Sequence, residues 1–135
     1  MILGGDLGGT KTLLALAESE AGRIRIVHQQ RFASADYPTF DALLGDFLAG
    51  RPAIASACFG VAGPTDGDSA RLTYLPWSLA AAELARRFGM ARVTLANDFA
   101  AAAHGLALVE PEHIVTLRAG QPIEDAPRVI LGAGT

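Results

Sequence analysis

Three short segments combine glycine with hydroxyl, carboxylate or amide side chains, which are the groups that bind phosphate and carbohydrate. The first segment, residues 4–12, reads GGDLGGTKT. Gly8 and Gly9 can adopt positive φ and let backbone N–H groups approach an anion, and the hydroxyl of Thr10 adds a donor. The segment predicts a nucleotide-phosphate loop; an ordinary glycine-rich hairpin turn is the alternative.

Two charged residues flank this turn. Asp6 is a candidate Mg²⁺ ligand, directly or through water, because Mg²⁺ is held by few carboxylates together with phosphate oxygens. Lys11, the single lysine of the chain, either supplies positive charge to a phosphate or points to solvent. The segment is not a Walker A loop, because Thr10 occupies the place of its second glycine and the apolar run 12–17 predicts a strand rather than a helix. The dinucleotide-binding pattern G-x-G-x-x-G is not met either.

The second segment is Asn97-Asp98-Phe99, at a predicted junction between a strand and a helix. Asp98 has two interpretations. It is a favoured helix cap, or it is a base that takes the proton of an attacking hydroxyl in phosphoryl transfer. Asn97 can both donate and accept hydrogen bonds to a polyol. The ends of strands are where α/β sheets bind ligands.

The third segment is Gly132-Ala133-Gly134-Thr135, a second glycine–threonine turn after the apolar run 129–131. Two such turns, each after a strand, are more informative than one. Together they indicate a protein that handles a phosphorylated nucleotide.

Composition limits the class of protein. The chain has 135 residues, of which 50% are hydrophobic and 19% charged, so one ordinary domain with a real core is expected. A net charge of −3 argues against a nucleic-acid partner. No signal peptide or membrane-length apolar stretch is found, which predicts a cytoplasmic protein. The single cysteine, Cys58, is expected to be a small buried residue on a strand.

The elements that must position these segments follow from hydrophobic patterning. Runs at 12–17 and 23–26 predict an antiparallel hairpin, and the alternation Arg23-Ile24-Arg25-Ile26 predicts one buried face. A helix is predicted from Pro38 to a stop at Gly50, because one apolar face follows the i, i+3, i+4, i+7, i+8 spacing with Phe40, Leu43, Leu44, Phe47 and Leu48. A second helix is predicted from a Ser78 cap to Phe88, ended by Gly89. Further expected elements are a strand at 54–61 buried on both faces, a strand at 93–96, a helix at 100–108, and strands at 114–117 and 129–131.

A strand pair followed by alternating helices and strands predicts an α/β domain with a mixed sheet. Five motifs then occur in a familiar order: DLGGT at 6–10, FGVAGP at 59–64, LTYLPW at 72–77, NDFAAAAHG at 97–105 and GAGT at 132–135. In this combination the chain resembles the N-terminal domain of a bacterial glucokinase, within the sugar-kinase, Hsp70 and actin superfamily. The resemblance spans essentially the whole chain.

The resemblance implies a ribonuclease-H-like, actin-like ATPase domain with flanking helices. It implies ATP-dependent phosphorylation of glucose, or of a similar hexose, by the full-length protein, with Mg²⁺. Asp98 would be the base for the sugar 6-hydroxyl. Asn97, Gly63 and Pro64 would also contact the sugar. The residues expected near the ATP phosphates are Asp6, which would also bind the metal, Gly8, Gly9, Thr10, Lys11, Gly132, Gly134 and Thr135.

Three departures from the glucokinase pattern matter. Lys11 replaces a usual Asn, as in the related family of repressors, open reading frames and kinases, so another hexose or N-acetylhexosamine is an alternative substrate. Tyr74 also stands where Asn is usual. The chain ends inside the second loop, so a larger C-terminal domain carrying the adenosine pocket and further sugar ligands is expected to be missing, and the isolated chain is expected to be an inactive half. His104 and His113 are not assigned to that role.

Two further expectations concern relatives and partners. A non-catalytic sugar-sensing relative is a second alternative, disfavoured because such relatives carry a DNA-binding segment ahead of a loop that here begins at Gly4. The expected partners are the hexose and the C-terminal domain, with a homodimer left open and with no nucleic acid or membrane.

Overall fold

The computed structural model describes residues 1–20, 23–121, 123–127 and 129–132. One five-stranded sheet carries the fold, in the order β3-β2-β1-β4-β7. The strands are β1 (Ile2–Leu7), β2 (Lys11–Glu20), β3 (Arg23–Ala33), β4 (Ser56–Val61) and β7 (Arg92–Asn97), with a separate pair of β5 (Ser69–Arg71) and β6 (Ser78–Ala80). The helices are α1 (Phe40–Leu48), α2 (Ala81–Phe88) and α3 (Asp98–Gly105), with short 3-10 turns η1 (Ser34–Asp36), η2 (Leu106–Leu108) and η3 (Pro111–His113).

The sheet is mixed, as the sequence predicted. β1, β4 and β7 are parallel, whereas β2 runs antiparallel to both β1 and β3. The register pairs Asp6 with Gly60 and Val61 with Asn97, so the carboxyl ends of three neighbouring strands meet at one edge. Open α/β sheets bind ligands beyond that edge.

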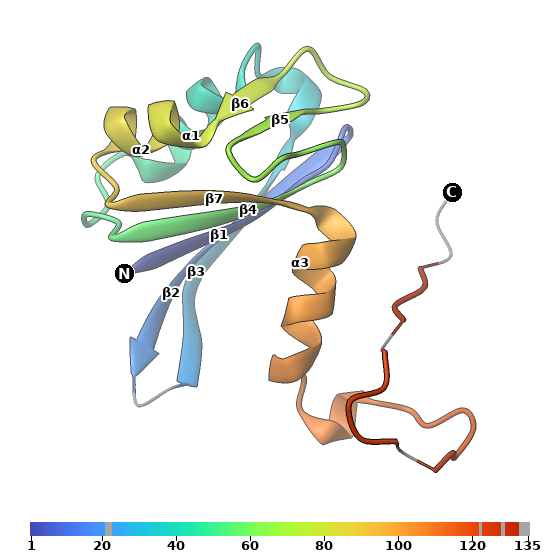
Figure 1. Cartoon of the computed structure of the whole chain (residues 1–135). Helices are drawn as coiled ribbons and strands as arrows, with labels where there is room; N and C mark the ends of the chain where they lie inside the picture. The colour runs from blue at the N-terminus through green and yellow to red at the C-terminus, as the bar shows by residue number, and fades with distance from the viewer. Residues whose placement is uncertain (21–22, 122, 128, 133–135) are drawn as a thin grey trace.

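Helices α1 and α2 cover one face of the sheet, and α3 leaves the end of β7 toward the opposite side (Figure 1). The main core lies under α1 and α2. The inward side chains of α1 are Phe40, Leu43, Leu44 and Phe47, all at most 2% exposed. Phe40 packs edge-on against Phe59 of β4, with ring centroids 5.0 Å apart. The i, i+3, i+4, i+7 spacing read from the sequence therefore identified the correct face.

Both helices on this face begin later than the sequence suggested. α1 begins at Phe40 and not at Pro38, because the hydroxyl of Thr39 accepts a hydrogen bond from the Ala42 N–H at 3.2 Å and caps the helix. Ser78 is not a cap. It lies in β6, where its backbone pairs with β5, and α2 follows directly at Ala81. α2 ends at Gly89, which adopts the left-handed conformation (φ 66°), as expected for a glycine stop.

Two predicted strands are absent from the described residues. Residues 114–117 and 129–131 are irregular and do not pair with the sheet. Leu117 and Leu131 are 95% and 89% exposed. An apolar run forms a strand only when a neighbour accepts its hydrogen bonds and covers one of its faces, and the free edge of β7 does not meet these segments.

Two predictions of buried side chains were also wrong. Ile24 and Ile26 are 50% and 57% exposed, because β1 pairs with β2 only as far as Ala17 and the rest of the β2–β3 hairpin extends past it (Figure 1). Cys58 is on a strand, as predicted, but it is exposed. β4 is therefore not buried on both faces.

None of the helices in the described part of the chain is long and apolar enough to span a membrane.

Candidate active site

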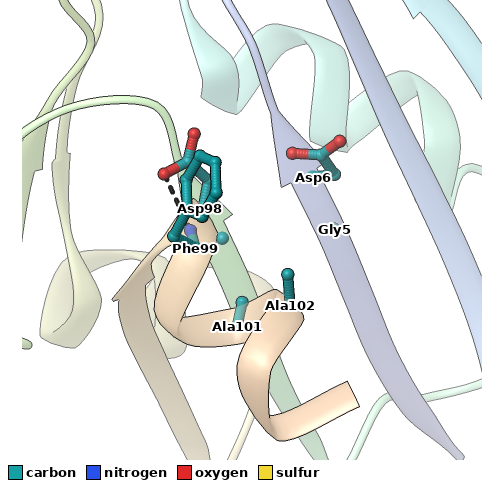
Figure 2. A pocket seen from close by; sticks show the side chains of 7 residues that line it. Gly5, Asp6, Asp98, Phe99, Ala101 and Ala102 are labelled. Carbon is teal, nitrogen blue, oxygen red and sulfur yellow. Dashed lines mark hydrogen bonds between the residues drawn. The ribbon is translucent and has the colours of Figure 1, made fainter. Parts of the chain in front are cut away.

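A cleft of about 390 Å³ lies at the carboxyl edge of the sheet. It is lined by residues of β1, β4 and α3, namely Gly5, Asp6, Gly60, Asp98, Phe99, Ala101 and Ala102. Figure 2 shows the carboxylates of Asp6 and Asp98 on two sides of this cleft. The structure thus brings together the two acidic residues that the sequence had singled out 92 positions apart.

Asp98 is held by the start of its own helix. It is the first residue of α3, and its Oδ1 accepts a hydrogen bond from the Phe99 N–H at 2.8 Å. Its Oδ2 forms no hydrogen bond within the described part of the chain. One oxygen is therefore fixed, while the other is available to a ligand in the cleft.

Asn97, and not Asp98, is the residue that caps α3. Its Oδ1 accepts hydrogen bonds from the N–H groups of Phe99 at 3.1 Å and Ala100 at 3.3 Å. The Asp98 carboxylate shares the Phe99 N–H with this cap. Because the Asn97 oxygen is engaged, its amide NH₂ is the group left to donate to a ligand.

The cleft concentrates negative charge. Partial burial raises the pKa of Asp6, and the neighbouring Asp98 carboxylate raises it further. Two facing carboxylates of this kind repel each other and favour a proton or a cation between them. The described residues contain no group of three or more His, Cys, Asp or Glu side chains that could hold a metal ion.

The glycine turn that follows β1 is tightly closed. The Gly8 N–H donates to the Lys11 carbonyl at 3.0 Å, and the Ser34 N–H donates to the Thr10 carbonyl at 3.1 Å. Thr10 and Lys11 are exposed. Gly9 lies against Tyr74, since a Cβ added to Gly9 would be 2.8 Å from the Cβ of that tyrosine. Tyr74 itself is 83% exposed.

The other predicted site residues lie around the cleft. Gly63 and Pro64 are not among its lining residues, and Pro64 borders a separate hollow beside β5. Gly132 reaches the cleft wall, because a Cβ added there would be 2.6 Å from the Phe99 ring. Gly134 and Thr135 lie outside the described residues.

Sequence reasoning gave no role to three residues that pack against the cleft or the glycine turn. Gly60 lies where α3 crosses β4, and a Cβ added to it would be 3.2 Å from Ala101 Cβ. Thr12 and Ser34 lie fully buried behind the glycine turn. A glycine inside an otherwise apolar strand is a signal of close backbone approach, and it was available at Gly60.

Comparison with known proteins identifies the family of the chain. The sequence model of the glucokinase family matches residues 3–135. The chain is 37% identical over its whole length to the glucokinase of Nostoc punctiforme, and 31% identical over 97% of its length to that of an Enterobacter species. It spans about 40% of the length of these relatives.

Solved structures give the same result. A glucokinase from an Antarctic psychrotroph superimposes on 92% of this chain with a TM-score of 0.78 and 30% identity, over 40% of its own length. A sugar kinase assigned in Cytophaga hutchinsonii covers 78% of this chain with a TM-score of 0.61 and 26% identity. The fold is thus that of the actin-like sugar kinases. Within that class, the chain belongs to the glucokinase family.

Proposed function

We propose that the full-length protein phosphorylates glucose at its 6-hydroxyl with ATP, and that these 135 residues supply the catalytic base and one phosphate-binding turn. The observation that carries the proposal is the placement of Asp98 and Asp6 in one cleft at the carboxyl edge of the sheet. Family membership supports the sugar-kinase activity.

In this mechanism Asp98 is the base. Its unbonded Oδ2 accepts the proton of the sugar 6-hydroxyl. The sugar oxygen forms a bond to the γ-phosphorus, while the bond between that phosphorus and the oxygen that leaves with ADP breaks. The Phe99 N–H holds the other carboxylate oxygen, so the base is oriented before the substrate arrives. The amide NH₂ of Asn97 is positioned one residue away to donate to a sugar hydroxyl.

Asp6 and the Gly8–Lys11 turn serve the nucleotide. Asp6 would hold Mg²⁺, directly or through water, and the ion would neutralise charge on the ATP phosphates. The raised pKa of Asp6 fits such a role, because a bound cation relieves the repulsion between this carboxylate and Asp98. Backbone N–H groups of the turn, with the hydroxyl of Thr10, would face the phosphate oxygens.

We further propose that this chain alone is inactive. It spans about 40% of the length of its relatives, and its cleft is formed by a single sheet edge and one helix. A homodimer, a cytoplasmic location and sugar contacts from Gly63 and Pro64 stay predictions.

The test is an assay that couples ADP release to a spectroscopic signal. The full-length protein is assayed with glucose, mannose, fructose and N-acetylated hexoses, and the 135-residue chain is assayed beside it. We expect turnover that is fastest with glucose in the full-length protein and none in the short chain. ADP release by the short chain would contradict the inactive-half proposal, and a preference for an N-acetylated sugar would contradict glucose as substrate.

A further inference from the structure

Two buried hydroxyl groups lie behind the glycine turn. Thr12 and Ser34 are the only polar residues at 0% exposure in the described part of the chain. Their hydroxyl oxygens are 3.0 Å apart. A buried hydroxyl costs free energy unless it is hydrogen-bonded. Each of these two hydroxyl groups therefore needs a hydrogen-bond partner in this otherwise apolar interior.

The direction of the hydrogen bonds can be derived. Ser34 Oγ donates to the Gly8 carbonyl at 2.9 Å, and a carbonyl oxygen can only accept. A serine hydroxyl has one proton, so Ser34 cannot also donate to Thr12. Thr12 must therefore donate to Ser34. The result is a directed chain from the Thr12 hydroxyl through the Ser34 hydroxyl to the Gly8 carbonyl.

This chain fixes one peptide unit of the turn. In a planar trans peptide the C=O of one residue and the N–H of the next point in opposite directions. Because the Gly8 carbonyl points inward to Ser34, the Gly9 N–H points away from the buried side. Gly8 and Gly9 can reach either sign of φ, so this peptide could otherwise rotate and turn its oxygen toward an approaching anion.

We propose that Thr12 and Ser34 are positioning residues that hold the Gly8–Gly9 peptide so that the Gly9 N–H donates to a phosphate oxygen of the nucleotide. The identity of the anion as ATP rests on the proposed function. Ser34 also binds the turn at a second point, through its N–H and the Thr10 carbonyl. The two bonds together connect the turn to η1 at the end of β3.

The test uses the full-length protein with Ser34→Ala, Thr12→Val and Thr12→Ser. Ser34→Ala removes the donor to the Gly8 carbonyl, so the Gly9 N–H is no longer held toward the phosphate. Losing that hydrogen bond to a charged group should raise the KM for ATP by about tenfold to a hundredfold. Thr12→Val keeps the shape of the side chain but removes the hydroxyl that donates to Ser34. The KM for ATP should therefore rise by about twofold to tenfold. Thr12→Ser keeps the hydroxyl and should stay within about twofold of wild type. The KM for glucose should change by less than about twofold in all three.

A purely structural role would give a different result. It would lower thermal stability and reduce kcat/KM equally for ATP and glucose, with Thr12→Ser no better than Thr12→Val. That outcome overturns the proposal. If Ser34→Ala does not fold, the comparison of Thr12→Val with Thr12→Ser decides by the same criterion.

A second readout separates this proposal from the proposed function. The Gly9 amide resonance of ¹⁵N-labelled full-length protein is followed during titration with Mg²⁺ and a non-hydrolysable ATP analogue. We expect a large shift of the Gly9 amide proton in wild type and its loss in Ser34→Ala, or in Thr12→Val if the first variant does not fold. No Gly9 shift in wild type, or the same shift in the variant, overturns the proposal. A protein that phosphorylates no hexose but shows the expected shifts would refute only the proposed function.

Discussion

Replacing Gly60 by alanine should move Asp98, the proposed catalytic base, without changing its side chain. The added Cβ would lie 3.2 Å from Ala101 Cβ and 3.6 Å from Asp98 Cα. Carbon atoms in comfortable contact are about 3.5–4.0 Å apart. Helix α3 must therefore move away from β4 by roughly 0.3–0.8 Å, and Asp98, at its first turn, moves with it.

The size of the effect follows from that displacement. A misplacement of about 1 Å in a catalytic arrangement costs about a hundredfold in rate. A shift of 0.3–0.8 Å then predicts a fall in kcat of roughly fourfold to fortyfold, if the logarithm of the rate scales with distance. Overpacking should also lower the free energy of unfolding by about 1–3 kcal/mol. The coupled ADP-release assay and urea unfolding of the full-length protein measure the two effects.

A second substitution provides the control. Ala101→Gly removes the methyl group that the new Cβ meets, so the double variant Gly60→Ala/Ala101→Gly should recover most of the lost kcat. It should remain less stable than wild type by about 1 kcal/mol, because glycine is unfavourable inside a helix. Unchanged kcat in Gly60→Ala, or no recovery in the double variant, would refute the argument that close packing at Gly60 positions the base.

Three further predictions concern stability. Thr39→Ala should lower the free energy of unfolding by about 1 kcal/mol through loss of the α1 cap; no change in the urea midpoint would contradict it. Gly63→Ala should cost about 3 kcal/mol or more, since its Cβ would lie 2.1 Å from the Arg71 carbonyl oxygen, and a variant as stable as wild type would show that this contact is easily relieved. Asp6→Asn should raise the melting temperature at pH 7 but not at pH 3. The raised pKa of Asp6 means that the folded state retains this proton to higher pH than the unfolded chain, so stability is lost as pH rises through the folded pKa; a variant melting below wild type at pH 7 would reverse that sign.

The sequence predicted the parts of this protein whose signals are local. The apolar spacing of α1, the glycine stop of α2 and the strand-to-helix junction at Asp98 all depend on neighbours within a few residues. The order of five motifs also identified the fold and the two carboxylates of the cleft. Such features can be predicted from short stretches of sequence.

The parts that sequence reasoning missed depend on distant partners. Alternation at Ile24 and Ile26 marks an apolar face, but whether that face is covered depends on where β1 stops pairing with β2. Ser78 has the side chain of a helix cap, yet pairing with β5 places it in a strand. The Thr12–Ser34 pair joins positions 22 residues apart, and the sequence around neither residue predicts the contact.

The proposed role of Asp98 as the base for phosphoryl transfer to a hexose can be tested by a single comparison. ADP release with glucose is compared between the full-length wild type and Asp98→Asn, with melting temperature as the check on folding. Asparagine keeps the size of the side chain and cannot take the proton, so kcat should fall by about 10²–10⁴-fold in a folded variant. Turnover by Asp98→Asn close to that of wild type would show that Asp98 is not the base.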